Sequence, residues 1–288
     1  MIDTKNAIIA ATETVNRMKR LNTDAKRVAL FLGRDDSHSI ATAQKLKRLL
    51  IKNKLYVESD ANFVIFVGGD GTLLRAVQEN LNNLSNIAFI GVVTGTLGFF
   101  ADYTGNELEL LVRNILTDDF VYQENTLLEG KLTNSFGEKR VYALNEIRIE
   151  NPFHTLVVNV NIDNSFLEEY HGSGLSICSS LGSTAYNRSL GGAIMSSSVN
   201  LLQLTEISTI TNNRFSSLNS PLVLGDKQVV SISGVFSNCV IGHDHLSFSL
   251  PNENNKSLFT ISLSDKKVLF AQRKHLSATD RLRRAFIN

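Results

Sequence analysis

Phe63-Val-Ile-Phe-Val67, followed at once by Gly68-Gly69-Asp70-Gly71-Thr72, indicates the fold class most directly. Five consecutive apolar residues that end at glycines predict a strand buried on both faces, as in a parallel sheet. Similar apolar runs at Val28–Leu32 and Ile87–Val92 lie on either side of it in the sequence. Helical patterns separate the runs, so the first part of the chain predicts a doubly wound α/β domain.

The helical patterns have apolar residues at near-helical spacing, and the last of them opens with a Thr104-x-x-Glu107 capping box. We expect helices over residues 5–20, 40–53, from Asp70 to about Asn80, and up to about Thr117.

After about residue 120 the pattern changes to short alternating strands separated by turns such as Asn134–Gly137. We expect strands at Val141–Glu150, Thr155–Ile162, Val229–Val235 and Ser257–Leu263. The end of the chain has a strand-like Val268–Ala271 and a basic helix within Leu276–Asn288, and we expect it to return to the first domain. The predicted domains are an α/β phosphate-binding domain at 1–119, a β-rich, β-sandwich-like domain at 120–265, and a returning segment at 266–288.

The composition excludes several classes of protein. Of the 288 residues 43% are hydrophobic and 20% charged, and the net charge is +1, so neither nucleic acid nor an anionic membrane is the expected partner. No apolar run approaches the roughly 20 residues of a membrane helix, and the N-terminal stretch does not resemble a signal peptide. Two cysteines, Cys178 and Cys239, make neither a disulfide framework nor a CxxC metal site. We expect a cytoplasmic protein.

The Gly68–Thr72 loop is the strongest chemical signal. Glycines permit positive φ and leave no Cβ in the way of a phosphate, and the helix that follows offers its N-terminus to the same charge. A carboxylate in such a loop would repel phosphate, so Asp70 is expected to serve as a general base for an attacking hydroxyl. The alternative is a tight turn in which Asp70 caps the helix.

This loop resembles that of NAD kinases, of diacylglycerol and sphingosine kinases and of 6-phosphofructokinases, all ATP-dependent phosphotransferases. Further motifs favour the first of these. Taken in order from about residue 27 to the end, the set resembles the NAD kinase family closely, and is most similar to its Gram-positive bacterial type. The motifs are Thr94–Phe99, Ala143–Glu146, Gly182–Tyr186, Gly191–Ile194 and Asn212–Arg214, with Ser220–Val223.

The resemblance implies transfer of the γ-phosphoryl group of ATP to the adenosine ribose 2′-hydroxyl of NAD, with Mg²⁺ or another divalent cation bound to ATP. Asp70 would be the base, and the ATP phosphates would lie on Gly68, Gly69, Gly71 and Thr72. The β-rich domain would bind the dinucleotide, and a neighbouring subunit would contribute to the pocket, which implies a homodimer or homotetramer. The implied NAD-binding residues are Asp70, Gly71, Asn145, Glu146, His171, Ser173, Thr184, Ala185, Tyr186, Asn187, Arg188, Ser189, Ser208 and His245.

The chain also departs from the family pattern. Ser173 stands where the family has an aspartate between two glycines, Leu181 replaces a hydroxyl residue ahead of Gly182, and Val93 replaces an asparagine. Gln272–Leu276 replaces an aromatic and proline-rich tail. Two other functions therefore stay open at this point: a lipid or sphingoid-base kinase that shares the loop, and a sensor that binds NAD or NADP without turnover.

Other chemistry-bearing residues have a simpler interpretation. His243-Asp244-His245 has metal-like spacing, but no further cluster completes a zinc site, so these histidines are expected at a strand edge or in a pocket hydrogen bond. Cys178 is expected to be a buried small hydrophobe, and Ser183 has no base motif that would make it a nucleophile. The cationic tail is expected to be a solvated helix face: Arg281, Arg283 and Arg284.

Overall fold

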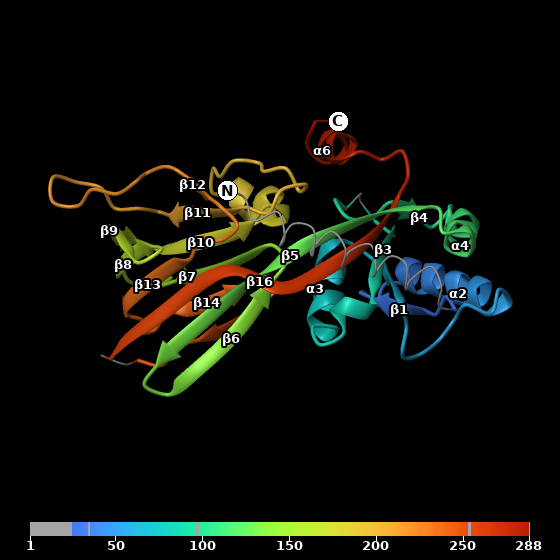
Figure 1. Ribbon diagram of the computed structural model, residues 1–288, viewed down its shortest axis with the longest axis horizontal. Coiled ribbons are helices and arrows are strands. Elements are labelled where there is room, and N and C mark those ends of the chain that lie inside the picture. Colours follow the sequence, from blue (N-terminus) through green and yellow to red (C-terminus); the bar gives the residue numbers. More distant parts are fainter. Residues whose placement is uncertain (1–24, 34, 96–97, 253–254, 288) are drawn as a thin grey trace, which may run out of the picture. The chain divides into compact units, whose positions relative to one another are not determined.

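The computed structural model describes residues 25–287 apart from 34, 96, 97, 253 and 254. The chain divides into two compact units, one of Met1–Glu124 with Lys266–Asn288 and the other of Asn125–Asp265. We call them the first and the second unit. Two long strands, β5 (Phe120–Asn134) and β16 (Lys256–Arg273), run from one unit into the other (Figure 1). The helix expected at 5–20 lies outside the described residues.

The first unit contains the predicted parallel sheet. β1 (Val28–Leu32) pairs with β2 (Phe63–Val67), and β2 pairs with β3 (Ala88–Val93), all parallel and in continuous register. The final part of β16 then pairs parallel with β3, through Leu269 and Phe270. The end of the chain therefore returns to the first unit, as predicted, and β2 and β3 are buried along their whole length.

The helices of the first unit supply the other half of its core. The buried strand residues cluster with Leu46 and Leu50 of one helix and with Leu111 and Ile115 of another. The helices are α2 (Ser37–Lys52), α3 (Asp70–Glu79), α4 (Leu108–Thr117) and α6 (Ala278–Phe286), with a short 3₁₀ turn η1 at Leu84–Asn86. No helix in the described ranges is both long enough and apolar enough to span a membrane.

The capping-box prediction was wrong about where α4 begins. Glu107 Oε2 does accept a hydrogen bond of 3.1 Å from the Thr104 N–H, as in a capping box. Thr104, however, belongs to the short strand β4 (Tyr103–Thr104), and Glu107 itself is the N-cap of α4. The contact closes a turn in front of the helix instead of starting the helix at Thr104.

The second unit is β-rich, as predicted, and its core lies between two antiparallel sheets. Leu175, Ile177 and Ile149 of one sheet pack in a single hydrophobic cluster with Val158 and Phe259 of the other. The first sheet has the order β12 (Leu222–Leu224), β11 (Leu202–Ile207), β10 (Gly174–Ser179), β7 (Glu146–Glu150), β14 (Val240–His243), β15 (Leu246–Ser249). The second sheet contains β6 (Gly137–Ala143), β8 (Leu156–Ile162), β9 (Ser165–Gly172) and β13 (Val230–Val235), with the parts of β5 and β16 in this unit.

Two strand predictions were wrong in their limits. The strand expected at Val141–Glu150 is broken at Leu144 and Asn145, because β6 belongs to one sheet and β7 to the other. The strands expected at Ser257–Leu263 and Val268–Ala271 are one continuous strand, β16. The break at Asn145 places a chemically important residue at the point where the chain changes sheets.

Candidate active site

Gly68 is required by the backbone of the loop between β2 and α3. Its φ is +147°, and a Cβ added there would lie 2.3 Å from Thr72 Oγ1. Its N–H donates to the carbonyl oxygen of Val92 on β3, at 2.9 Å. The loop therefore leaves β2 in a conformation and a space that only glycine fits well.

The next glycines leave open space. A Cβ added to Gly69 or to Gly71 would meet nothing within 4 Å, and both residues lie at the start of α3, where helix N–H groups have no partners within the helix. Thr72 is buried beneath the loop, with its side chain where a Cβ on Gly33 would have to go. This is the geometry of an anion site at a helix N-terminus.

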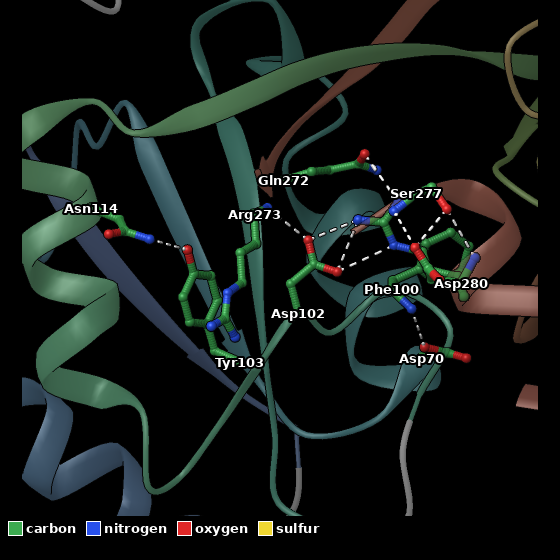
Figure 2. A network of polar contacts seen from close by, with 10 residues as sticks. Asp70, Phe100, Asp102, Tyr103, Asn114, Gln272, Arg273, Ser277 and Asp280 are labelled. Carbon is green, nitrogen blue, oxygen red and sulfur yellow. Dashed lines mark hydrogen bonds and ion pairs between the residues drawn. The ribbon is translucent and has the colours of Figure 1, made fainter. Parts of the chain in front are cut away.

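Backbone amides hold the Asp70 carboxylate. The Phe99 N–H donates to Asp70 Oδ2 at 3.0 Å. The Phe100 N–H donates to Asp70 Oδ1 at 3.2 Å (Figure 2). A Cβ on Gly98 would lie 2.6 Å from Asp70 Oδ1, so glycine lets this segment approach the carboxylate closely. The carboxylate is thus oriented by the protein and retains lone pairs for a further proton or hydroxyl.

In the second unit, Asp244 fixes the turn that carries Asn145 and Glu146. Its carboxylate accepts hydrogen bonds of 2.8 Å from the N–H groups of Leu144 and Asn145. Its own N–H donates to the Glu146 carbonyl oxygen, at 3.1 Å. A buried carboxylate therefore takes up the backbone donors at the point where the chain passes from β6 to β7.

The same turn contacts the Gly182–Tyr186 loop, which includes the 3₁₀ turn η2 (Leu181–Thr184) and the short helix α5 (Tyr186–Ser189). Ser179 donates its N–H to the Asn145 carbonyl oxygen at 2.9 Å and its hydroxyl to that of Leu144 at 2.6 Å. A Cβ on Gly182 would lie 2.0 Å from the Asn145 carbonyl oxygen. Glycine at 182 is therefore what lets two motifs nearly 40 residues apart in the sequence touch.

Polar atoms in this place are buried without a protein partner. Among the described residues, Asn145 Oδ1, Glu146 Oε2 and Arg148 Nε belong to the few buried side-chain atoms that make no hydrogen bond. Burial, with the nearby Asp244 carboxylate, raises the pKa of Glu146 to about 7. Unpaired buried polar groups cost about 1–3 kcal/mol each, so a cluster of them indicates a site that a ligand completes.

Aromatic and cationic groups flank these atoms. The Arg148 guanidinium lies 4.7 Å from the centroid of the Tyr186 ring. Thr184, Ala185 and Tyr186 are partly exposed, and His245 is exposed in the turn after β14, next to Asp244. The structure therefore places the Gly182–Tyr186 loop against the Asn145–Glu146 turn, and His245 directly follows Asp244, which fixes that turn.

His171, Ser173 and Ser208 form a separate group at the other end of β10. Cys178 of β10 pairs with Glu146 and Gly174 pairs with Glu150, so the two ends are about 13 Å apart along the strand. His171 stacks on Phe215 at 3.9 Å and lines a cavity of about 390 Å³. Within one chain, these residues and the Asn145–Glu146 turn do not form one cluster.

Asn187 is placed differently from the expectation. Its side chain is fully buried, and its amide bonds the carbonyl oxygens of Ser183 and Ala193 and the hydroxyl of Thr205. This side chain holds the loop together, and the structure does not present it to a ligand. The neighbouring Arg188 and Ser189 are exposed.

Three other expectations concern residues outside the site. Arg281 was wrongly expected on a solvated face, because it is the one buried residue of α6. Cys178 is buried, as predicted, and burial raises its pKa to about 12. Within the described parts of the chain, no three His, Cys, Asp or Glu side chains gather as metal ligands would.

Sequence reasoning missed Asp244 and Arg148. Asp244 lies between two histidines in the sequence, and no local pattern marks it. It accepts hydrogen bonds from two backbone amides about 100 residues away, which only the fold brings near. Arg148 lies two residues after Glu146 and therefore on the same face of β7, and this alternation of charged and apolar residues was the available signal.

Two protein families match parts of this chain. Residues 52–120 match the family described as the ATP-NAD kinase N-terminal domain, and residues 144–270 match the ATP-NAD kinase C-terminal domain. A NAD kinase of Geobacillus stearothermophilus is 39% identical over 274 residues, which is 94% of this chain and 99% of that protein. A Staphylococcus aureus NAD kinase is 36% identical over 264 residues, or 90% and 97% of the two chains.

Solved structures share the fold. Yeast NADH kinase in complex with NADH aligns with a TM-score of 0.78 at 16% identity, covering 91% of this chain and 87% of that one. An NAD kinase from Archaeoglobus fulgidus in complex with ATP aligns with a TM-score of 0.69 at 19% identity, covering 90% and 97%.

Proposed function

Because this chain belongs to the NAD kinase family and is an ATP-dependent NAD kinase, we propose that its reaction is carried by Asp70 as general base and by Asn145 and Glu146 as ligands of NAD. The observation that carries the assignment is the set of buried, unpartnered atoms Asn145 Oδ1 and Glu146 Oε2. The two open alternatives, a lipid-type kinase and a silent sensor, are not favoured by the relatives, which are named NAD kinases.

In the proposed reaction the adenosine ribose 2′-oxygen of NAD attacks the γ-phosphorus of ATP. The bond from the γ-phosphorus to the β–γ bridging oxygen breaks, ADP leaves, and the 2′-hydroxyl proton passes to the Asp70 carboxylate. The amides of Phe99 and Phe100 hold that carboxylate in one orientation before the substrate arrives. NADP is the product.

The phosphates of ATP are proposed to lie over Gly69 and Gly71, where the backbone leaves open space at the start of α3. Gly68 shapes this loop, and Thr72 packs beneath it. The divalent cation enters as the MgATP complex, a substrate.

The adenosine part of NAD is proposed to bind at the Asn145–Glu146 turn. A buried carboxyl group accepts hydrogen bonds from ribose hydroxyls, and an amide oxygen accepts one from the adenine amino group. Tyr186, already held against Arg148, supplies a face for the base. Thr184, Ala185 and His245 lie around the same turn.

We further propose a homodimer or homotetramer in which His171, Ser173 and Ser208 complete the NAD pocket of a neighbouring subunit. Their place at the opposite end of β10 from Glu146 supports this, because within one chain they are remote from the adenosine site. Sedimentation velocity tests it, and a protein that stays monomeric with NAD at working concentration would overturn it.

We expect the reaction in the cytoplasm, where buried free thiols such as Cys178 stay reduced.

The test of the function is Asp70→Asn, measured as NADP formation from NAD and MgATP in a coupled dehydrogenase assay. Turnover should fall by about 10²–10⁴-fold, the usual contribution of a positioned base, with KM for ATP little changed. Asp60→Asn is the matched control, because the Asp60 side chain is 86% exposed, and it should retain full activity. Near-normal turnover in the Asp70 variant would remove the proposed role.

A further inference from the structure

The first unit contains a buried ion pair that the reaction chemistry does not use. Arg281 Nη2 lies 2.9 Å from Asp102 Oδ1 and 2.8 Å from Oδ2, and Arg281 Nε lies 3.2 Å from Oδ1. The two side chains are only 8% and 5% exposed. The Arg273 N–H adds a hydrogen bond of 2.9 Å to Asp102 Oδ2, so the carboxylate is fully surrounded by donors (Figure 2).

Local structure explains how Arg281 comes to this position. Ser277 and Asp280 form a capping box, with Ser277 Oγ accepting from the Asp280 N–H at 3.1 Å, so α6 begins at Ala278 (Figure 2). Arg281 is the one residue of α6 that is buried. Its third donor group, Nη1, reaches Gln272 Oε1 at 3.1 Å, on the final part of β16.

Asp102 ends the segment whose amides hold Asp70. Phe99 and Phe100, which donate to the Asp70 carboxylate, lie three and two residues before Asp102. Aromatic contacts tie the same segment to the end of the chain. The Phe100 ring stacks on Phe270 with centroids 5.8 Å apart, and the Phe99 ring stacks on Phe286 of α6 at 6.5 Å.

Stability alone is a poor reason for such a pair. Moving two charges out of water is costly, and apolar residues of similar volume often stabilise a protein as well as a buried ion pair or better. A bidentate arginine–carboxylate contact, however, fixes geometry in a way that apolar packing does not. Phosphoryl transfer depends mainly on positioning, so an oriented base is where fixed geometry has most effect.

We propose that Arg281 and Asp102 are positioning residues for Asp70: through their ion pair, α6 fixes the segment whose Phe99 and Phe100 amides orient the catalytic carboxylate. This rests on the proposed role of Asp70. The C-terminal helix is then part of the catalytic apparatus without touching substrate, and its effect appears in kcat more than in KM.

The test is the double variant Arg281→Met with Asp102→Asn, which removes both charges together and leaves an acceptor for the Arg273 N–H. We expect kcat for NADP formation to fall about tenfold or more, with KM for ATP and for NAD within about twofold of the parent. Circular dichroism and the thermal midpoint report whether the fold is kept. Arg283→Met is the matched control, because Arg283 is on the same helix with a side chain 61% exposed, and it should leave kcat unchanged.

A second measurement separates positioning from a general loss of structure. Arg281→Lys, which keeps one charged contact with Asp102, should have a kcat between that of the parent and that of the double variant. In an Asp70→Asn background, removing the pair should cause little further loss, because the group it orients is gone.

The proposal is overturned if removing the ion pair lowers kcat by the same factor in the Asp70→Asn background as in the parent. It is also overturned if the double variant folds and its kcat is unchanged. If Asp70→Asn alone leaves turnover intact, it is the base assignment that fails, and that outcome is read from the single variant.

Discussion

Glu146→Gln removes a carboxyl group that is buried beside a second carboxylate, and its effect on stability should depend on pH. Burial and Asp244 raise the pKa of Glu146 from an ordinary 4.5 to about 7. Between these values the unfolded chain releases a proton that the folded protein keeps. The free energy of unfolding therefore falls as the pH rises, by about 1.4 kcal/mol per pH unit.

The stabilisation from neutral Glu146 is thus complete below about pH 4.5 and is lost as the pH rises through about 7. Glutamine cannot ionise, so the variant lacks this loss. Between pH 5 and pH 8 the variant should gain about 2.5 kcal/mol relative to the parent. Any cost of burying the glutamine amide is the same at every pH. Such a cost shifts the difference in free energy of unfolding by a constant and does not change its slope with pH.

The assay is urea unfolding of both proteins at several pH values, followed by circular dichroism, because the chain has no tryptophan for fluorescence. Subtracting the two curves cancels the other titrating groups. Glu58→Gln is the surface control, since its side chain is 84% exposed. A flat difference for Glu146→Gln would contradict this prediction, because Glu146 would then ionise over the same pH range in the folded protein as in the unfolded chain.

At pH 8, where Glu146 is mostly ionised, the same Glu146→Gln variant should weaken NAD binding by about 1–2 kcal/mol while leaving KM for ATP nearly unchanged, because a charge-assisted acceptor bond is lost; equal changes in both constants would contradict this. Asp244→Asn should raise KM for NAD and lower the free energy of unfolding by about 1–3 kcal/mol, because one of two buried backbone donors loses its acceptor. Ser173→Asp should tighten NAD binding by about 1 kcal/mol in titration calorimetry, because a carboxylate is a stronger acceptor than a hydroxyl; no gain would mean that the pocket is built around serine. Chelation by EDTA should abolish turnover without changing the thermal midpoint, because the cation enters with ATP.

The parts of the fold that follow from local pattern could be predicted from the sequence. Phe63–Val67 is apolar throughout and is buried throughout, so the parallel sheet needed only the length and continuity of its strands. The break at Leu144 and Asn145 could not be predicted in the same way. Strand alternation continues across it, and only Asp244, about 100 residues later, supplies the acceptors that let the backbone turn there.

The residues of the candidate site also differ in how well the sequence predicts them. Residues proposed to meet substrate, such as Asp70 and Glu146, are found in short motifs because several of them must act within a few residues of one another. The groups that orient them have no such constraint. The residues around Arg281 in the sequence have the pattern of a solvated, basic helix face. Its buried partner, Asp102, lies 179 residues earlier in the chain. A side chain whose partner is that distant carries the same local sequence signal whether it is exposed or buried, so its role becomes visible only once the fold has brought the two together.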